Sequence, residues 1–169
     1  MTKKRVLSLL VATAISLSII TGCGSKTEPK KDDTKSTAAT SQYKDGKYKA
    51  EYDKADERKW KAFIEIEIKD GKIASSNFDY VNDKGQFKSK DEGYNKMMKE
   101  QGKKTCAEEF SKKFNEGLVS KQDVEKVDGV SGATHSFDDF KTLSSKVLSE
   151  KATKGDTSTL LVPAPTPSK

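Results

Sequence analysis

Cysteine, histidine and tryptophan are scarce in this 169-residue chain, which has two cysteines, one histidine and one tryptophan. Two cysteines allow at most one disulfide, so the chain is not a disulfide-rich scaffold. A single histidine beside so few cysteines argues against a zinc site. The acidic stretch at residues 79–92 lacks the glycine that a calcium loop needs at its sixth position. We therefore expect no metal site.

A long uninterrupted hydrophobic run is also missing. The apolar run at residues 6–20 is broken by threonine and serine, which makes a permanent transmembrane helix the weaker interpretation. Three basic residues precede this run, and small residues follow it up to Cys23. A basic start, a short apolar run and small residues at its end are typical of an export signal, which we predict at residues 1–22.

The chain has no strong excess of charge of one sign once this signal is removed. The net charge is +6, and loss of the three basic residues at positions 3–5 lowers it to +3. Charges of both signs alternate along residues 84–113, which is typical of a solvated surface. A nucleic-acid interface gathers basic residues on one face, so we expect no nucleic-acid partner.

Two terminal segments have compositions that favour extended chain. Residues 24–42 hold no aromatic or large aliphatic residue, so residues 23–42 are predicted to form a flexible tether. Residues 153–169 end in alternating prolines, which predicts a disordered tail. The remaining stretch, residues 43–152, holds about 110 residues and is long enough for one small domain.

This domain is predicted to begin with three strands. Apolar residues alternate with polar ones at residues 47–52 and 62–69, which favours half-buried strands. Asp70-Gly71 predicts a two-residue hairpin turn into a third strand at residues 73–80. Apolar residues then recur with helical spacing at residues 91–101, 107–121 and 136–150. This order predicts an α+β fold, with a small antiparallel sheet and helices packed on it.

The last predicted helix follows a turn of small residues, Asp128-Gly129-Val130-Ser131-Gly132-Ala133-Thr134-His135-Ser136. Ser131, Gly132 and Ala133 have little side-chain bulk, so their backbone amides can approach an anion at the positive end of the helix dipole. Ser136 and Asp139 have capping-box spacing, which predicts a helix that starts at Ser136. The pattern fits phosphate binding, and it also fits an ordinary helix start.

This turn resembles the flavinylation motif of the FMN-binding domain family, an aspartate followed by Ser/Thr-Gly-Ala-Thr. The resemblance implies that Thr134 carries FMN through its phosphate, attached by a flavin transferase that uses FAD and magnesium. It leaves three roles open for Asp128: recognition by the transferase, magnesium binding during transfer, or an ordinary place in the turn. His135 lies where the family varies, and we assign it no catalytic role.

The resemblance extends over residues 43–150, although only the Thr134 motif is specific enough to indicate a function by itself. The other matching segments are Asp45-Gly46-Lys47-Tyr48, Asp70-Gly71-Lys72-Ile73, Phe78-Asp79-Tyr80, Lys88-Ser89-Lys90-Asp91 and Tyr94-Asn95-Lys96-Met97-Met98. Among family members, the chain resembles bacterial surface lipoproteins. Ile20-Thr21-Gly22-Cys23 resembles a lipobox, which implies cleavage before Cys23 and a diacylglycerol on its sulfur. The protein is then anchored by lipid at the extracytoplasmic face of the cell membrane.

The resemblance implies an electron carrier rather than an enzyme with its own substrate. It implies that electrons come from a membrane NADH dehydrogenase or quinol and pass to extracellular acceptors. The isoalloxazine ring needs an apolar or aromatic bed, and Tyr80, Tyr94, Met97 and Met98 are the candidates, although each is also an ordinary core or surface residue. The alternative is a non-redox surface lipoprotein, whose signal sequence is also open to interpretation as the source of a signalling peptide.

Overall fold

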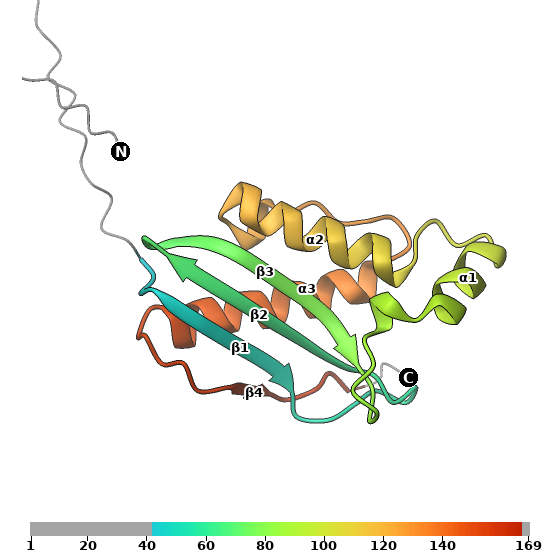
Figure 1. The fold of residues 1–169 in the computed structure, drawn as a ribbon, viewed down its shortest axis with the longest axis horizontal. Coiled ribbons are helices and arrows are strands. Elements are labelled where there is room, and N and C mark those ends of the chain that lie inside the picture. The colour runs from blue at the N-terminus through green and yellow to red at the C-terminus, as the bar shows by residue number, and fades with distance from the viewer. Residues whose placement is uncertain (1–41, 167–169) are drawn as a thin grey trace, which may run out of the picture. The chain divides into compact units, whose positions relative to one another are not determined.

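Four strands form one sheet in the computed structural model, which describes residues 42–166. β1 (Gly46–Tyr52), β2 (Lys61–Lys69) and β3 (Lys72–Val81) form the predicted antiparallel meander. A fourth strand, β4 (Leu160–Val162), pairs with the other edge of β1, so the order across the sheet is β3-β2-β1-β4 (Figure 1).

The β2–β3 hairpin turns at the two residues that the sequence predicts. Lys69 pairs with Lys72, and the φ angles of Asp70 and Gly71 are 50° and 66°. Two successive residues with positive φ are the geometry of a type I′ turn. The Asp45 carboxylate accepts hydrogen bonds from both turn N–H groups, at 3.0 and 2.9 Å, so the residue before β1 fixes the same hairpin.

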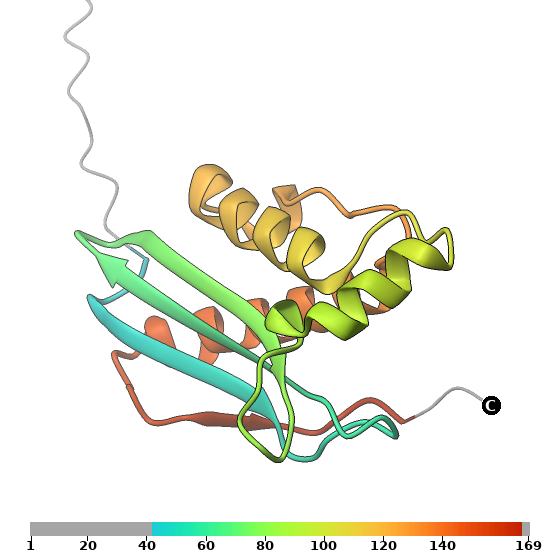
Figure 2. The same ribbon diagram turned by 45° about the vertical axis from the view of Figure 1, so that its right-hand side comes forward.

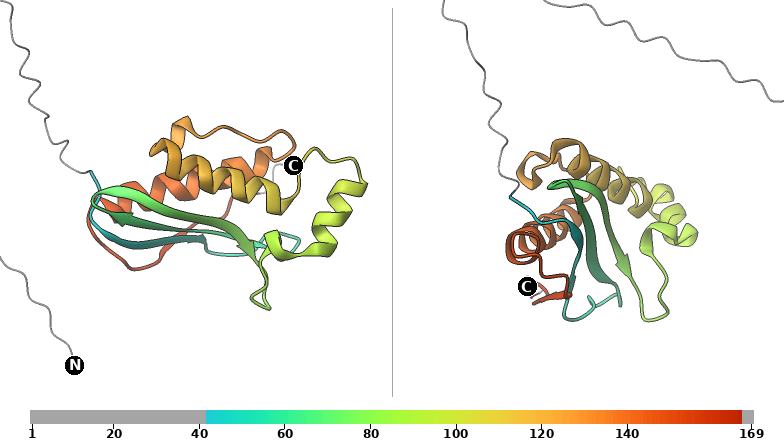
Figure 3. Two further views of the ribbon diagram at one scale, coloured as in Figure 1. Left: turned by 45° about the horizontal axis from the view of Figure 1, so that its top comes forward. Right: turned by 60° about the vertical axis from the view of Figure 1, so that its left-hand side comes forward.

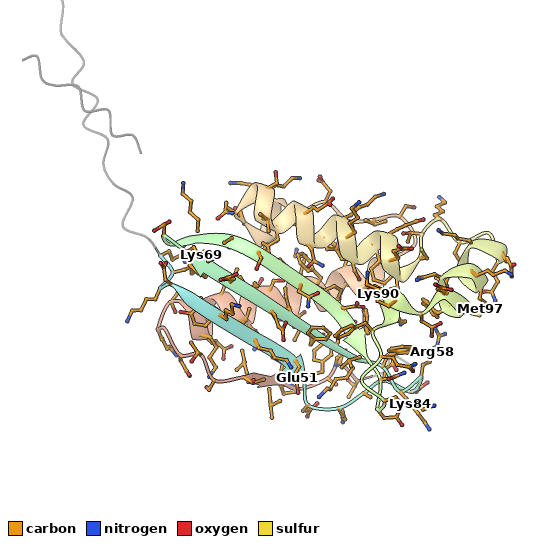
Figure 4. All side chains as sticks on the ribbon, in the orientation of Figure 1. Glu51, Arg58, Lys69, Lys84, Lys90 and Met97 are labelled. Carbon is orange, nitrogen blue, oxygen red and sulfur yellow. The ribbon has the colours of Figure 1, made fainter. Side chains whose placement is uncertain are left out.

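Alternation along the strands decides which face of the sheet is buried. The core residues of β1 and β2 are those predicted to share one face: Tyr48, Ala50, Tyr52, Ala62, Ile64, Ile66 and Ile68. Figure 1 views the sheet from its opposite face. Charged side chains such as Glu51 and Lys69 stand on that face (Figure 4), which no helix of residues 42–166 covers.

Two long helices, α2 (Ala107–Lys121) and α3 (Thr134–Val147), pack against the buried face of the sheet (Figure 3). Phe114 of α2 lies at the centre of their contact. Its ring is 5.2 Å from the rings of both Phe137 and Phe140 on α3, and 6.1 Å from Phe78 on β3. This aromatic cluster joins the beginning of α3 to α2 and to the sheet, and it confirms the predicted α+β fold.

A shorter helix, α1 (Glu92–Glu100), precedes α2. Asp91, the residue before its first position, caps it with a carboxylate that accepts a hydrogen bond from the Tyr94 N–H at 2.9 Å. Asn95 is buried; it donates to the Ser89 carbonyl at 2.9 Å and accepts from the Glu108 N–H at 3.3 Å. Asn95 thereby connects α1 to α2 and to a short helix, η1 (Lys88–Lys90), which the sequence patterns do not predict.

The predicted start of α3 is wrong by two residues. The helix begins at Thr134, and the Ala133 carbonyl already accepts a hydrogen bond from the Phe137 N–H at 2.9 Å. Ser136 therefore lies inside the helix and does not cap it. The capping box does not form, because Asp139 turns inward to accept hydrogen bonds from two tyrosines. Beyond Val147 the helix widens into a π turn, η3 (Leu148–Ala152).

The predicted disordered tail is wrong for the part that the structure describes. Leu160, Leu161 and Val162 form β4, which runs parallel to β1, and Val162 joins the core. The pairing of these three apolar residues with β1 and the burial of Val162 hold this segment in the fold, although prolines follow it. The predicted export signal and all but residue 42 of the tether lie outside the described residues. Between residues 42 and 166, no helix is long and apolar enough to cross a membrane.

Candidate functional site

The turn at residues 128–133 places Thr134 at the first position of α3. Gly132 has a φ of 88°, which favours glycine, and a β-carbon there would lie 3.5 Å from Lys104 Cβ. The segment between α1 and α2 therefore runs against the turn, near the start of α3 (Figure 2). The Ala133 N–H, expected to face an anion, donates instead to the Val130 carbonyl at 2.9 Å.

The start of α3 keeps the features of an anion site. The first N–H groups of a helix have no acceptor within the helix, Ala133 supplies no side-chain cap, and the first turn holds no acidic residue. Thr134 is exposed, and no hydrogen bond to its hydroxyl occurs among residues 42–166. Free N–H groups at the positive end of a helix attract phosphate, so this end fits a phosphate joined to the Thr134 hydroxyl.

The other residues of the motif have separate places. Asp128 is paired with Lys121 at 2.5 Å, but its side chain is 89% exposed, so it remains accessible in the turn. Ser131 and His135 are exposed on either side of Ala133 and Thr134, and Ser136 is half-buried. In the folded domain Asp128 forms an ion pair with Lys121. The backbone of the turn, rather than Asp128, positions Thr134 at the start of α3.

Asp139 links α3 to the ends of two strands. Its Oδ1 accepts from the Tyr52 hydroxyl and its Oδ2 from the Tyr80 hydroxyl, both at 2.8 Å. Burial raises the pKa of Asp139, and the two tyrosine hydrogen bonds oppose that rise. Burial and the Asp139 charge raise the pKa of Tyr80 well above its ordinary value, while the Ser136 hydroxyl opposes them. Tyr80 therefore lies beside the first turns of α3.

Next to Tyr80, the ammonium of Lys88 contacts three aromatic rings. Lys88 Nζ lies 4.4 Å from the ring centre of Tyr80, 4.9 Å from Tyr94 and 5.7 Å from Trp60. The rings come from β3, α1 and the residue before β2. We call Lys88 with Trp60, Tyr80 and Tyr94 the aromatic cage. Sequence reasoning named Tyr80 and Tyr94 but missed Trp60 and Lys88, although Trp60 is the only tryptophan.

The structure brings together only some of the residues predicted to contact the isoalloxazine ring. Tyr80 and Tyr94 share the aromatic cage, whereas Met97 is 41% exposed on α1 (Figure 4) and Met98 is half-buried on the same helix. Two surface hollows, of about 410 Å³ beside α1 and about 270 Å³ on the uncovered sheet face, do not include Thr134 in their linings. Thr134 lies at an open helix end.

Known proteins resemble this chain in sequence and in fold. The family model for the FMN-binding domain matches residues 59–149, which include the aromatic cage, Asp139 and Thr134. The chain is 33% identical over 111 residues to the 15 kDa lipoprotein of Treponema pallidum (strain Nichols), covering 66% of this chain and 77% of that protein. It is 33% identical to the CPE2226 protein from Clostridium perfringens, whose crystal structure gives a TM-score of 0.68 with 73% of this chain and 99% of that one covered. Since the match contains both the Thr134 turn and the elements that position it, the chain belongs to the FMN-binding domain family.

Proposed function

We propose that Thr134 carries FMN through a phosphoester and that the protein is an electron carrier at the cell surface. The observation that carries this proposal is the exposed Thr134 hydroxyl at the uncapped start of α3, in a first turn without acidic residues. Bound FMN supplies reversible electron transfer at its isoalloxazine ring. The chain's own residues supply the attachment point, the surroundings of the ring and the rigidity of the site.

The residues around Thr134 divide these tasks. Gly132 lets the turn adopt a positive φ of 88° beside the Lys104 segment, and this turn sets the approach to α3. The free N–H groups of the first turn would hold the phosphate. The ribityl chain separates the phosphate from the ring. The aromatic cage is one aromatic surface connected to α3, through the Tyr80–Asp139 hydrogen bond. Trp60, Tyr80 and Tyr94 are therefore the residues that would border the ring.

The remaining parts of the proposal concern location and partners. The lipobox-like residues 20–23 and the relative named as a lipoprotein support a diacylglycerol anchor on Cys23 at the extracytoplasmic face. A flavin transferase that uses FAD and magnesium would attach the FMN, and the accessible carboxylate of Asp128 is available to it or to its magnesium. A membrane NADH dehydrogenase or quinol would supply the electrons.

The attachment is tested by producing the full chain together with a flavin transferase, FAD and magnesium. The wild type should carry FMN on the peptide that contains Thr134 and keep flavin fluorescence after denaturation. Thr134→Ala removes the acceptor oxygen and should lose all covalent flavin. Its unfolding free energy should change by less than about 0.5 kcal/mol, because the side chain is exposed.

Ser136→Ala is the matched control, since it removes a second hydroxyl two residues further along the same helix. It should keep the covalent flavin. Flavin bound covalently to Thr134→Ala, or an unmodified Thr134 in the wild type despite an active transferase, would contradict the proposal. The non-redox surface lipoprotein would then be the better description of this protein.

A further inference from the structure

We propose that Lys88 is the cation that raises the reduction potential of the flavin, by stabilising the negative charge that reduction places on the isoalloxazine ring. This proposal rests on the proposed attachment of FMN at Thr134. It follows from three features of Lys88: its fixed position, its lack of a nearby counterion, and its connection to α3 through Tyr80.

The position of Lys88 is fixed by the hydrogen bonds of the next residue, Ser89, to Asp79 of β3. Asp79 is buried in β3, and its carboxylate accepts from the Ser89 N–H at 3.1 Å and from the Ser89 hydroxyl at 2.5 Å. The same carboxylate accepts from the Tyr80 N–H at 2.7 Å. Asp79 thus fastens η1 to the end of β3, so Lys88 has little freedom to leave the aromatic cage.

The charge of Lys88 has no counterion at short range. The residue is only 6% exposed, and among the described residues it forms no ion pair. Burial, the largest influence, lowers its pKa; the charged groups that act on it from further away are Asp56, Arg58, Asp79 and Asp139. The faces of the three rings attract a cation but carry no net charge. A desolvated ammonium in this setting keeps a strong field over its neighbours.

Tyr80 connects this charge to the helix that bears Thr134. One face of its ring lies 4.4 Å from Lys88 Nζ, and its hydroxyl donates to Asp139, five residues after Thr134 on α3. Five residues are about one and a half helical turns. Lys88, Tyr80 and the first turns of α3 are therefore joined by packing and by a hydrogen bond. They lie at the end of the sheet where β3 finishes (Figure 1).

The sign of the effect follows from charge balance. Two-electron reduction of FMN with uptake of one proton adds one net negative charge to the ring, and nearby charge sets the potential of a bound flavin. A fixed cation favours that reduced form. Removal of the cation should therefore make the flavin harder to reduce, without changing how the flavin is attached. In the titration that measures this effect, dithionite supplies the electrons.

Lys88→Met removes the charge and keeps an unbranched, flexible side chain that can fill the same space. At a fixed ambient potential, the ratio of reduced to oxidised FMN in the flavinylated variant should fall about tenfold, equal to ~30 mV for a two-electron couple. A spectroelectrochemical titration measures this ratio. Lys88→Arg restores a cation and should recover most of the wild-type ratio. Lys90→Met, an equal change in net charge at an exposed residue of the same short helix (Figure 4), should leave the ratio unchanged.

Peptide mass analysis of every flavinylated protein separates the two proposals. A wild type without flavin on Thr134 would overturn the proposed function. With the flavin in place, an unchanged ratio in Lys88→Met would overturn the role of Lys88 alone. An equal loss in Lys90→Met would overturn it too, because net charge would then explain the effect. If folded Lys88→Arg protein has the same low ratio of reduced to oxidised FMN as Lys88→Met, the role of Lys88 is overturned as well. The change in potential would then result from altered packing rather than from the lost charge.

Discussion

Asp139 holds a half-buried carboxylate that accepts hydrogen bonds from the hydroxyls of Tyr52 and Tyr80. Burial raises its pKa above the ordinary 3.8, despite the hydrogen bonds that oppose this rise. The folded protein therefore binds a proton at Asp139 more tightly than the unfolded chain does. The contribution of Asp139 to the free energy of unfolding is fully present below about pH 3.8 and is lost as the pH rises through the raised pKa.

Asp139→Asn should remove this pH dependence. An asparagine keeps an acceptor for one tyrosine and can donate to the other, but it does not ionise. The unfolding free energy of the wild type should therefore fall relative to that of Asp139→Asn as the pH rises from about 4 to about 7. Urea denaturation at a series of pH values measures the difference between the two proteins.

Asp83→Asn is the control for this measurement, because Asp83 is exposed in the turn after β3. It should follow the wild-type curve. Asp139→Ala leaves two tyrosine hydroxyls without their acceptor and should cost about 2–4 kcal/mol of unfolding free energy. If Asp139→Asn has the same pH dependence as the wild type, Asp139 does not titrate in the way that its burial implies.

At the scale of elements, β4 protects an edge of the sheet. It covers β1, which would otherwise present unpaired N–H and C=O groups to other chains. The Asp53 N–H donates to the Val162 carbonyl at 2.9 Å, and the Asp53 carboxylate accepts from the Ala164 N–H at the same distance. Val162 is 3% exposed. This short strand is therefore fastened to the domain at its C-terminal end as well as by its pairing.

Removal of residues 159–169 should destabilise the domain. Loss of the buried Val162 side chain alone should lower the unfolding free energy by about 1.5–3 kcal/mol, and the bared edge of β1 should promote association between molecules. Urea denaturation and size-exclusion chromatography measure the two effects. A chain that ends at residue 166 is the control and should behave as the full domain. A truncated protein as stable and as monomeric as this control would show that β4 adds nothing to the fold.

At the scale of the whole molecule, the proposed carrier needs an attachment to the membrane as well as a flavin. The only cysteine in the described residues is Cys106, which is buried at the start of α2. A buried thiol is inaccessible to acylation in the folded domain, so Cys23 is the candidate for lipid attachment. The tether predicted between Cys23 and the domain would let the flavin site stand away from the lipid surface.

Cys23→Ser should abolish lipid attachment, because the serine oxygen replaces the sulfur that receives the diacylglycerol. Labelling with a radioactive fatty acid and membrane fractionation should find unlabelled precursor or protein shed from the membrane. Cys106→Ala is the control and should remain labelled and membrane-bound. A processed Cys23→Ser protein that fractionates with membranes as fully as the wild type would rule out the lipoprotein anchor.

The sequence by itself determines the first three strands, the β2–β3 turn and the Thr134 motif. Side-chain alternation and Asp-Gly turn chemistry act between near neighbours, and the Thr134 motif is a contiguous string that can be read without a fold. The same local rules fail at Ser136, where the expected capping box does not form. They also fail at residues 160–162, where the neighbouring prolines lead to the prediction of a disordered tail instead of a strand.

Only the tertiary structure decides the role of Asp139, the pairing of β4 and the assembly of the aromatic cage. Asp139 could satisfy its carboxylate locally, yet it turns to Tyr52 and Tyr80, which lie 87 and 59 residues away in the chain. Lys88 meets Trp60 and Tyr94 only because η1, α1 and the start of β2 converge at one end of the sheet. Contacts between distant residues leave no periodic pattern in the sequence, since nothing but packing brings them together.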